Sequence, residues 1–141
     1  ERKIDHIIDM QHGDSENLPY ENGCFDAVTV AFGVRNFENL EQGLSEMLRV
    51  TRNGGKIAIL EFSKPKKFPV KLTFQWYSKY IIPFFGKRIA KDEKAYAYLP
   101  ESVNVFPEGK EFTDILEKIG YRSVTAKTLS GGIATLYTGL K

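Results

Sequence analysis

Hydrophobic and polar positions along this chain follow two kinds of pattern. Residues 25–32 and 56–62 are largely apolar runs with the length of strands that are buried on both faces. Between them, residues 39–52 follow a helical period, and one apolar face is formed by Leu40, Leu44, Met47 and Leu48. Asn39 is a suitable N-cap, and Gly54 follows the helix as a stop signal. Strand, helix and strand in this order predict a crossover connection between two parallel strands.

The remaining periodic segments predict a strand, a helix and a hairpin. Residues 4–10 have the branched apolar content of a short strand. Residues 108–119 have the spacing of an amphipathic helix that ends near a glycine. Residues 124–129 and 133–137 read as two strands joined through a Ser-Gly-Gly turn, which predicts an antiparallel hairpin. The expected fold class is therefore α/β, with a mostly parallel sheet that ends in an antiparallel hairpin.

An acidic turn precedes the first long apolar run. Residues 13–20 read GDSENLPY, and the apolar run at 25–32 follows almost at once. This arrangement resembles the adenosine-binding half of a class I, Rossmann-like S-adenosylmethionine methyltransferase. The resemblance implies that the Asp14 carboxylate accepts from the adenine amine and that the backbone N–H of Ser15 contacts the cofactor. It also places Ala31 at the cofactor, because open α/β sheets bind ligands at the carboxyl ends of their strands. As an alternative, Asp14 is an ordinary turn residue.

Two parts of such a cofactor site have no counterpart before Gly13. The fold class implies a glycine-rich turn after its first strand and an acidic residue at the end of its second strand. We therefore expect the chain to be the C-terminal portion of a longer enzyme, with little activity and weak cofactor binding of its own. Without its usual neighbours, the strand at 25–32 becomes a sheet edge. This predicts a homodimer or a strand-swapped oligomer, or a strand at 4–10 that moves beside residues 25–32.

A narrower resemblance rests on four short segments. They are residues 31–37 (AFGVRNF), 60–65 (LEFSKP), 98–102 (YLPES) and 132–134 (GIA). Together they resemble the UbiE/MenG family of quinone-pathway C-methyltransferases over essentially the whole chain. The resemblance implies methylation of a ring carbon of a polyprenyl quinol with S-adenosylmethionine. The acceptor would be demethylmenaquinol or the benzoquinol precursor of ubiquinone, and the residues leave that choice open.

The same resemblance points to Arg35 and Asn36 as catalytic residues. They follow the strand that carries the cofactor contact, so they lie where the methyl group is delivered. An arginine stays protonated, so Arg35 is expected to stabilise a developing oxyanion and to organise a water that takes the proton. Asn36 can orient a hydroxyl group or that water. As alternatives, Arg35 is a surface ion-pair residue, and Glu61 contacts the substrate or supports a neighbouring group.

Residues 64–107 interrupt the alternation of strands and helices. Five prolines divide this segment, and residues 72–85 form an aromatic-rich helical pattern. Residues 64–94 carry 9 basic and 2 acidic side chains, a local charge of +7 within a chain of net charge +2. The aromatic stripe is either packing surface or a passage for a polyprenyl tail, with anionic lipid facing Lys64, Lys66, Lys67 and Lys71. The aromatic residues follow a helical period, so we expect no nucleic-acid partner.

Composition narrows the remaining choices. The length of 141 residues fits a single domain over 1–141, with 64–107 as a substrate or lid insertion. The single cysteine, Cys24, excludes an intrachain disulfide, and two histidines without a cysteine cluster predict no metal site. We expect a cytoplasmic protein with peripheral contact to the inner membrane. Two other functions stay open: a methyltransferase with another small-molecule acceptor, and a non-catalytic interaction domain with this fold.

Overall fold

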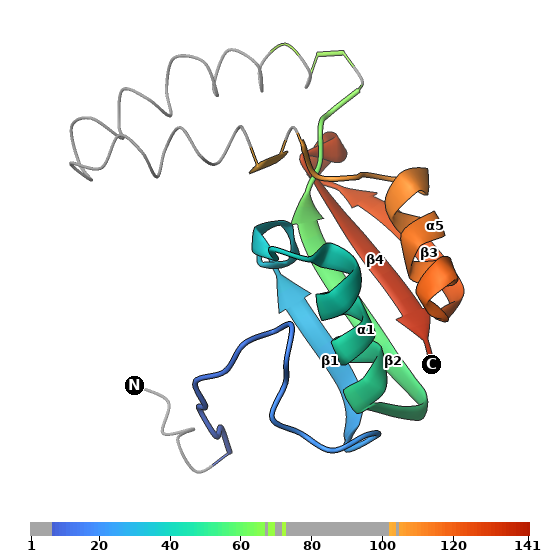
Figure 1. The fold of residues 1–141 in the computed structure, drawn as a ribbon. Coiled ribbons are helices and arrows are strands. Elements are labelled where there is room, and N and C mark those ends of the chain that lie inside the picture. The colour runs from blue at the N-terminus through green and yellow to red at the C-terminus, as the bar shows by residue number, and fades with distance from the viewer. Residues whose placement is uncertain (1–6, 67, 70–71, 73–101, 104) are drawn as a thin grey trace, which may run out of the picture.

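A computed structural model describes residues 7–66, 68–69, 72, 102–103 and 105–141. These residues form one four-stranded sheet with a helix pair on one of its faces (Figure 1). Nearly all of the aromatic pattern at 72–85, and most of the basic segment, lies outside the described residues. The proposed insertion is therefore described only at its two ends.

The sheet has the order β1-β2-β4-β3. Strand β1 (Phe25–Ala31) pairs in parallel with β2 (Thr51–Phe62), as the crossover pattern predicted. Strand β4 (Ala134–Leu140) lies antiparallel between β2 and β3 (Arg122–Leu129). A short 3₁₀ turn, η4 (Ser130–Gly132), joins β3 to β4 and confirms the predicted hairpin. The parallel pair of strands followed by an antiparallel hairpin confirms the α/β fold class. The described sheet is mixed and not mostly parallel, because β2–β4 and β3–β4 both pair antiparallel.

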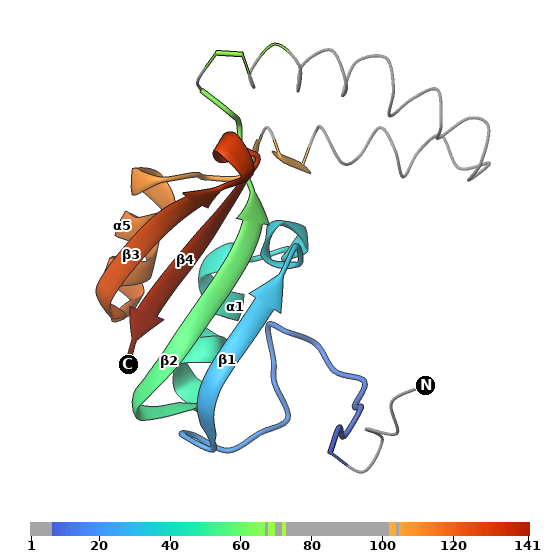
Figure 2. The ribbon, with the colours of Figure 1, turned by 180° about the vertical axis from the view of Figure 1, so that it is seen from behind.

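Both helices lie against the same face of the sheet. Helix α1 (Leu40–Val50) covers β1 and β2, and α5 (Lys110–Ile119) covers β3 and β4 (Figure 1). Seen from behind, the opposite face has no described helix over it (Figure 2). The Asn39 side chain caps α1 by accepting from the backbone N–H of Gln42 at 3.1 Å, as its sequence position predicted.

The core lies between the two helices and the sheet. Alternate side chains of β2 and β4 point into it, because successive side chains of a strand face opposite sides. Aromatic rings fill its centre: Phe112 lies 4.6 Å from the Tyr137 ring and 5.0 Å from the Phe106 ring, between centroids. The buried cluster consists of Val34, Leu44, Met47, Ile57, Ile59, Phe106, Phe112, Leu116, Tyr121 and Tyr137.

The strand expected over residues 4–10 is wrong in its described part. Residues 7–10 adopt no strand conformation and are exposed, and residues 1–6 are outside the description. The physical reason is that a strand needs a neighbour to pair its backbone groups. No strand of the described residues lies beside 7–10, and this segment does not cover β1. Strand β1 therefore stands at the edge of the sheet, as expected.

Candidate functional site

The carboxyl ends of the parallel strands β1 and β2 meet at one edge of the sheet, where this class of fold binds its ligands. The chain turns sharply after β1, because Phe32 has a φ of 56°. A left-handed backbone at a phenylalanine is rare and costs energy. Its N–H still donates to the Leu60 carbonyl at 2.8 Å, which ties the turn to β2. The 3₁₀ turn η1 (Val34–Asn36) follows and carries both predicted catalytic residues.

The Arg35 side chain is held by several contacts at this edge. Its Nη1 donates to Glu61 Oε2 at 3.1 Å and to the Phe32 carbonyl. The backbone N–H of Arg35 donates to Glu61 Oε1 at 3.3 Å. The guanidinium carbon lies 5.4 Å from the centroid of the Phe62 ring, in cation–π range. Arg35 is therefore part of an ion pair that is nearly buried, not one at the surface. The Glu61 side chain is 0% exposed and the Arg35 side chain is 11% exposed.

One edge of the guanidinium, Nε and Nη2, has no acceptor among the described residues. Neither Nε nor Nη2 of Arg35 donates to any residue that the structure describes, and Nε is buried. An arginine binds a carboxylate, phosphate or other oxyanion best through two parallel N–H donors. A buried donor without an acceptor is also uncommon in folded proteins. An acceptor oxygen at the Nε–Nη2 edge would satisfy this donor.

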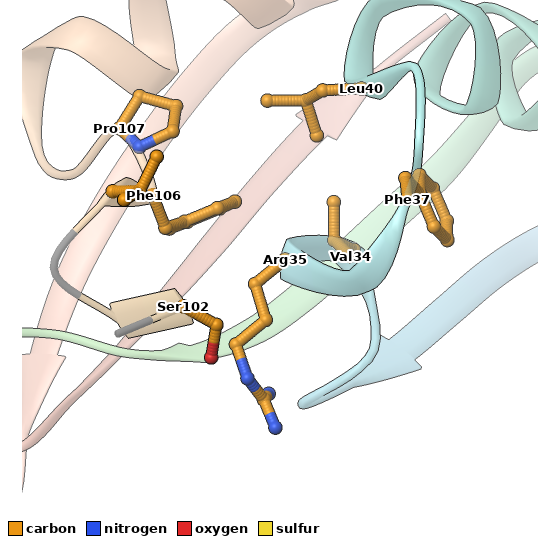
Figure 3. Close-up of a pocket in the computed structure, with 8 residues that line it drawn as sticks. Val34, Arg35, Phe37, Leu40, Ser102, Phe106 and Pro107 are labelled. Carbon is orange, nitrogen blue, oxygen red and sulfur yellow. The ribbon is translucent and has the colours of Figure 1, made fainter. Parts of the chain in front are cut away.

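An apolar cavity of about 320 Å³ adjoins Arg35. Val34 and Leu40 form one wall, and Phe106 and Pro107, from the segment that precedes α5, form the other (Figure 3). Arg35 and Ser102 lie at the lower rim in that view. The complete lining consists of Val34, Arg35, Phe37, Leu40, Ser102, Val105, Phe106 and Pro107. Its apolar walls and single cation fit a ligand with a hydrophobic body and one anionic or strongly polar group.

Hydrogen bonds hold the chain at both ends of the 64–107 segment, and the C-terminal end of this segment supplies Phe106 to the cavity wall. The backbone N–H of Lys64 donates to Glu108 Oε2 at 2.8 Å, so the outgoing and returning chains are joined. The Ser63 hydroxyl donates to the Gly132 carbonyl at 2.9 Å, and Thr135 Oγ1 donates to Ser63 Oγ at 2.9 Å. These bonds place the base of the segment beside the cavity. A role for residues 64–107 as a substrate insertion stays a prediction.

Asp14 lies in a tight turn that precedes β1 and bridges to Asn17. Its Oδ1 accepts from the Glu16 N–H at 2.9 Å, and its carbonyl accepts from the Asn17 N–H at 3.1 Å. The turn interpretation of Asp14 is thus confirmed, but it occupies only one carboxylate oxygen. Oδ2 of Asp14 and the backbone N–H of Ser15 bond to none of the described residues, and both residues are exposed. An adenine contact by this pair stays a prediction that the geometry permits.

Helix α1 holds the loop that carries Asp14. Near the start of α1, the Asn39 N–H donates to Glu16 Oε1 at 3.0 Å. Farther along, Arg49 donates to the Leu18 carbonyl at 2.9 Å and to the Tyr20 carbonyl at 2.7 Å. Arg49 also bonds both oxygens of Glu46, and this lowers the pKa of Glu46. No local sequence pattern indicates this support, because it joins residues about 30 positions apart.

The remaining predicted site residues lie at the same strand end as Arg35. Ala31 is the last residue of β1 and is exposed, and Asn36 ends η1 and is exposed. The structure thus brings Ala31, Arg35 and Asn36 together but places Asp14 and Ser15 on a separate loop. Sequence reasoning missed Phe32, Phe62 and Phe106. Each belongs to an apolar segment and has no feature that distinguishes it from an ordinary core residue.

Among the described residues there is no cluster of His, Cys, Asp and Glu that could hold a metal ion. In the same part of the chain, no helix is long and apolar enough to cross a membrane.

Comparison with known proteins identifies the family. The profile of the ubiE/COQ5 methyltransferase family matches residues 1–141. The chain belongs to this family. The demethylmenaquinone methyltransferase of Bacteroides fragilis is 45% identical over 134 residues, which cover 95% of this chain and 55% of that protein. The enzyme of the same name from Porphyromonas gingivalis is 42% identical over 138 residues, which cover 98% and 56%. The chain thus spans about half the length of the curated relatives it matches.

Solved structures confirm the fold of this ubiE/COQ5 family member. The [4+2]-cyclase SpnF aligns with a TM-score of 0.69 at 14% identity, over 99% of this chain and 59% of that one. A SAM-dependent methyltransferase from Aquifex aeolicus aligns with a TM-score of 0.61 at 16% identity, over 98% and 59%. One neighbour is named a cyclase and the other a methyltransferase. The fold alone therefore does not determine the reaction, which depends on the residues of the site.

Proposed function

We propose that this chain is part of an S-adenosylmethionine-dependent C-methyltransferase whose acceptor is a polyprenyl quinol, demethylmenaquinol. The observation that carries the proposal is the apolar cavity lined by Arg35, whose Nε has no hydrogen-bond acceptor among the described residues. Such a site fits an aromatic ring with an apolar substituent and one oxygen that becomes negative. The names of the relatives at 40–45% identity favour demethylmenaquinol over the benzoquinol precursor of ubiquinone.

The residues present fit the adenosine end of this cofactor. The Asp14 carboxylate has one oxygen to accept from the adenine amine, and the Ser15 N–H can donate to a ring nitrogen. Ala31 is the last residue of β1, at the carboxyl end of the parallel pair of strands. When bound, S-adenosylmethionine supplies an electrophilic methyl group. The chain's own residues must then orient the acceptor and make its ring carbon nucleophilic.

Arg35 and Asn36 are the residues proposed for that task. A quinol ring carbon becomes a better nucleophile as the neighbouring oxygen loses its proton. The Nε–Nη2 edge of Arg35 would bind that oxygen and stabilise its negative charge, which is an oxyanion-hole role. The permanent charge of arginine makes it unsuitable as the base itself. Asn36 would orient the hydroxyl group or a water molecule that accepts the proton.

The cavity accounts for the apolar part of the acceptor. Its walls would bury hydrocarbon that would otherwise contact water, and this burial is worth roughly 0.8 kcal/mol per CH₂ group.

Three further proposals are lipid contact through residues 64–94, a passage for the polyprenyl tail and self-association through β1. The first two rest on charge and aromatic content, and the third rests on the edge position of β1.

The test is a methyl-transfer assay with the protein expressed from its complete coding sequence. The protein is incubated with S-adenosylmethionine that carries a labelled methyl group and with demethylmenaquinol, and the labelled quinol is measured by mass spectrometry. A parallel reaction uses the benzoquinol precursor of ubiquinone. We expect label in menaquinol. Label only in the second product would correct the acceptor, and no label in either would favour another acceptor or a non-catalytic domain.

A further inference from the structure

Glu61 is a carboxylate in an unusual place. It lies near the carboxyl end of β2 between Leu60 and Phe62, and it is 0% exposed. A charged group is costly to bury unless it is paired and hydrogen-bonded. Both oxygens of Glu61 are used: Oε1 accepts from the Arg35 N–H, and Oε2 accepts from Arg35 Nη1 and from the Phe62 N–H. In the part of the chain that the structure describes, Arg35 is its only cationic partner.

The contacts of Glu61 restrict both the backbone and the guanidinium of Arg35. One oxygen holds the backbone of Arg35, and the other holds its guanidinium. The position of η1 and the rotation of the side chain are therefore set by the same carboxylate. The Phe32 carbonyl shares Nη1, and the Phe62 ring lies beside the guanidinium. Nη1 is thus fully engaged, and the Nε–Nη2 edge is the part of the guanidinium that has no acceptor among the described residues.

We propose that Glu61 is a positioning residue for the reaction: it fixes the Arg35 guanidinium so that the Nε–Nη2 edge meets the acceptor oxygen. This inference rests on the proposed function, in which Arg35 stabilises that oxygen. Glu61 itself contacts no substrate in this scheme. It acts through Arg35, and its loss leaves the arginine charged but free to rotate away from the acceptor.

The experiment is a double-mutant cycle in the protein expressed from its complete coding sequence. Glu61→Gln keeps the shape of the side chain and removes its charge, and Arg35→Met removes the guanidinium. Glu61→Gln should lower kcat by about tenfold or more, because a misplaced oxyanion donor loses much of its effect, with little change in the Kd of S-adenosylmethionine. Arg35→Met should lower kcat further. The double variant should be no slower than Arg35→Met, since Glu61 has nothing left to position.

Two more measurements separate positioning from a purely structural role. The pH profile of kcat should move to higher pH in Glu61→Gln, because the acceptor oxygen then loses its proton less readily in the complex. Glu61→Asp, which keeps the charge but is one CH₂ shorter, should shift the profile in the same direction and provides the test if Glu61→Gln does not fold. The matched control is Thr51→Val, a buried residue at the opposite end of β2 whose hydroxyl donates to the Met47 carbonyl. It should change stability but leave the pH profile unchanged.

The outcomes distinguish this inference from the proposed function. Parental turnover in folded Arg35→Met would remove Arg35 from the mechanism, and the positioning role of Glu61 would fall with it. Slow turnover in Arg35→Met combined with parental kcat and pH profile in folded Glu61 variants would overturn only the role of Glu61. Additive losses in the double variant would also overturn it.

Discussion

Replacing Arg35 alone should lower the free energy of unfolding more than replacing Arg35 and Glu61 together. In Arg35→Met, the Glu61 carboxylate stays 0% exposed but loses its cationic partner. Breaking a buried ion pair from one side costs roughly 3–5 kcal/mol. Glu61 would keep the backbone donors of residues 35 and 62, so the loss should lie near the lower end, at about 3 kcal/mol. Arg35→Met/Glu61→Gln removes the unpaired charge and should recover most of this loss.

Equilibrium unfolding in urea measures these differences. With an m-value of about 2 kcal/mol per M, the midpoint of Arg35→Met should fall by roughly 1.5 M. The double variant should lie within about 0.5 M of the parent, because its remaining cost is an imperfect neutral hydrogen bond. Unchanged m-values would show that the unfolded states are comparable. If Arg35→Met and the double variant had the same midpoint, the loss would come from packing around residue 35, and the electrostatic reasoning would be refuted.

Three further predictions concern the cofactor loop and the core. Asp14→Ala in the protein from its complete coding sequence should weaken S-adenosylmethionine binding by roughly 1–3 kcal/mol in calorimetry, whereas an unchanged Kd would leave Asp14 as a turn residue only. Arg49→Ala should expose the amides of residues 18–22 to faster hydrogen exchange, because it removes the donors that hold this loop. Burial raises the pKa of Tyr121, so the unfolded state releases that proton first and stability should fall above about pH 10. Tyr121→Phe should flatten this fall in a urea series across pH.

The order of elements was predictable because it depends on local periodicity. The helical spacing at 39–52, the apolar runs beside it and the glycine signals around it are short-range features, and they predict a parallel pair of strands. The proximity of residues 31 and 62 follows from that pairing, since parallel strands end at the same edge. A site at that edge could therefore be predicted from the sequence.

The contacts inside the site were not predictable in the same way. The bond between Arg35 and Glu61 joins residues 26 positions apart and depends on the left-handed turn at Phe32. Phenylalanine gives no sequence signal for that conformation, which glycine and asparagine favour. The strand at 4–10 failed for a related reason. Its composition suits a strand, but strand formation depends on a neighbour that composition does not show.

The edge position of β1 leads to the last prediction, which concerns self-association of this 141-residue chain. Edge strands pair with other chains unless charges, bulges or prolines protect them. The other edge strand, β3, is protected by Arg122, by Lys127 and by a register shift near Ser123. Strand β1 has Asp26 as its only charged residue. Its register shifts between Phe25 and Ala27, but its pairing is regular from Ala27 to Ala31. Self-association should therefore proceed through β1.

Light scattering across a concentration series tests this. The parent chain should show a mass above 16.0 kDa that increases with concentration. Thr29→Lys places a charge on the exposed middle of β1 and should return the chain to the monomer mass. Thr128→Lys, the same exchange at an exposed position of β3, is the matched control and should leave the association unchanged. A parent chain that stays at 16.0 kDa throughout would show that the β1 edge recruits no partner, and equal effects of both lysines would place the contact elsewhere.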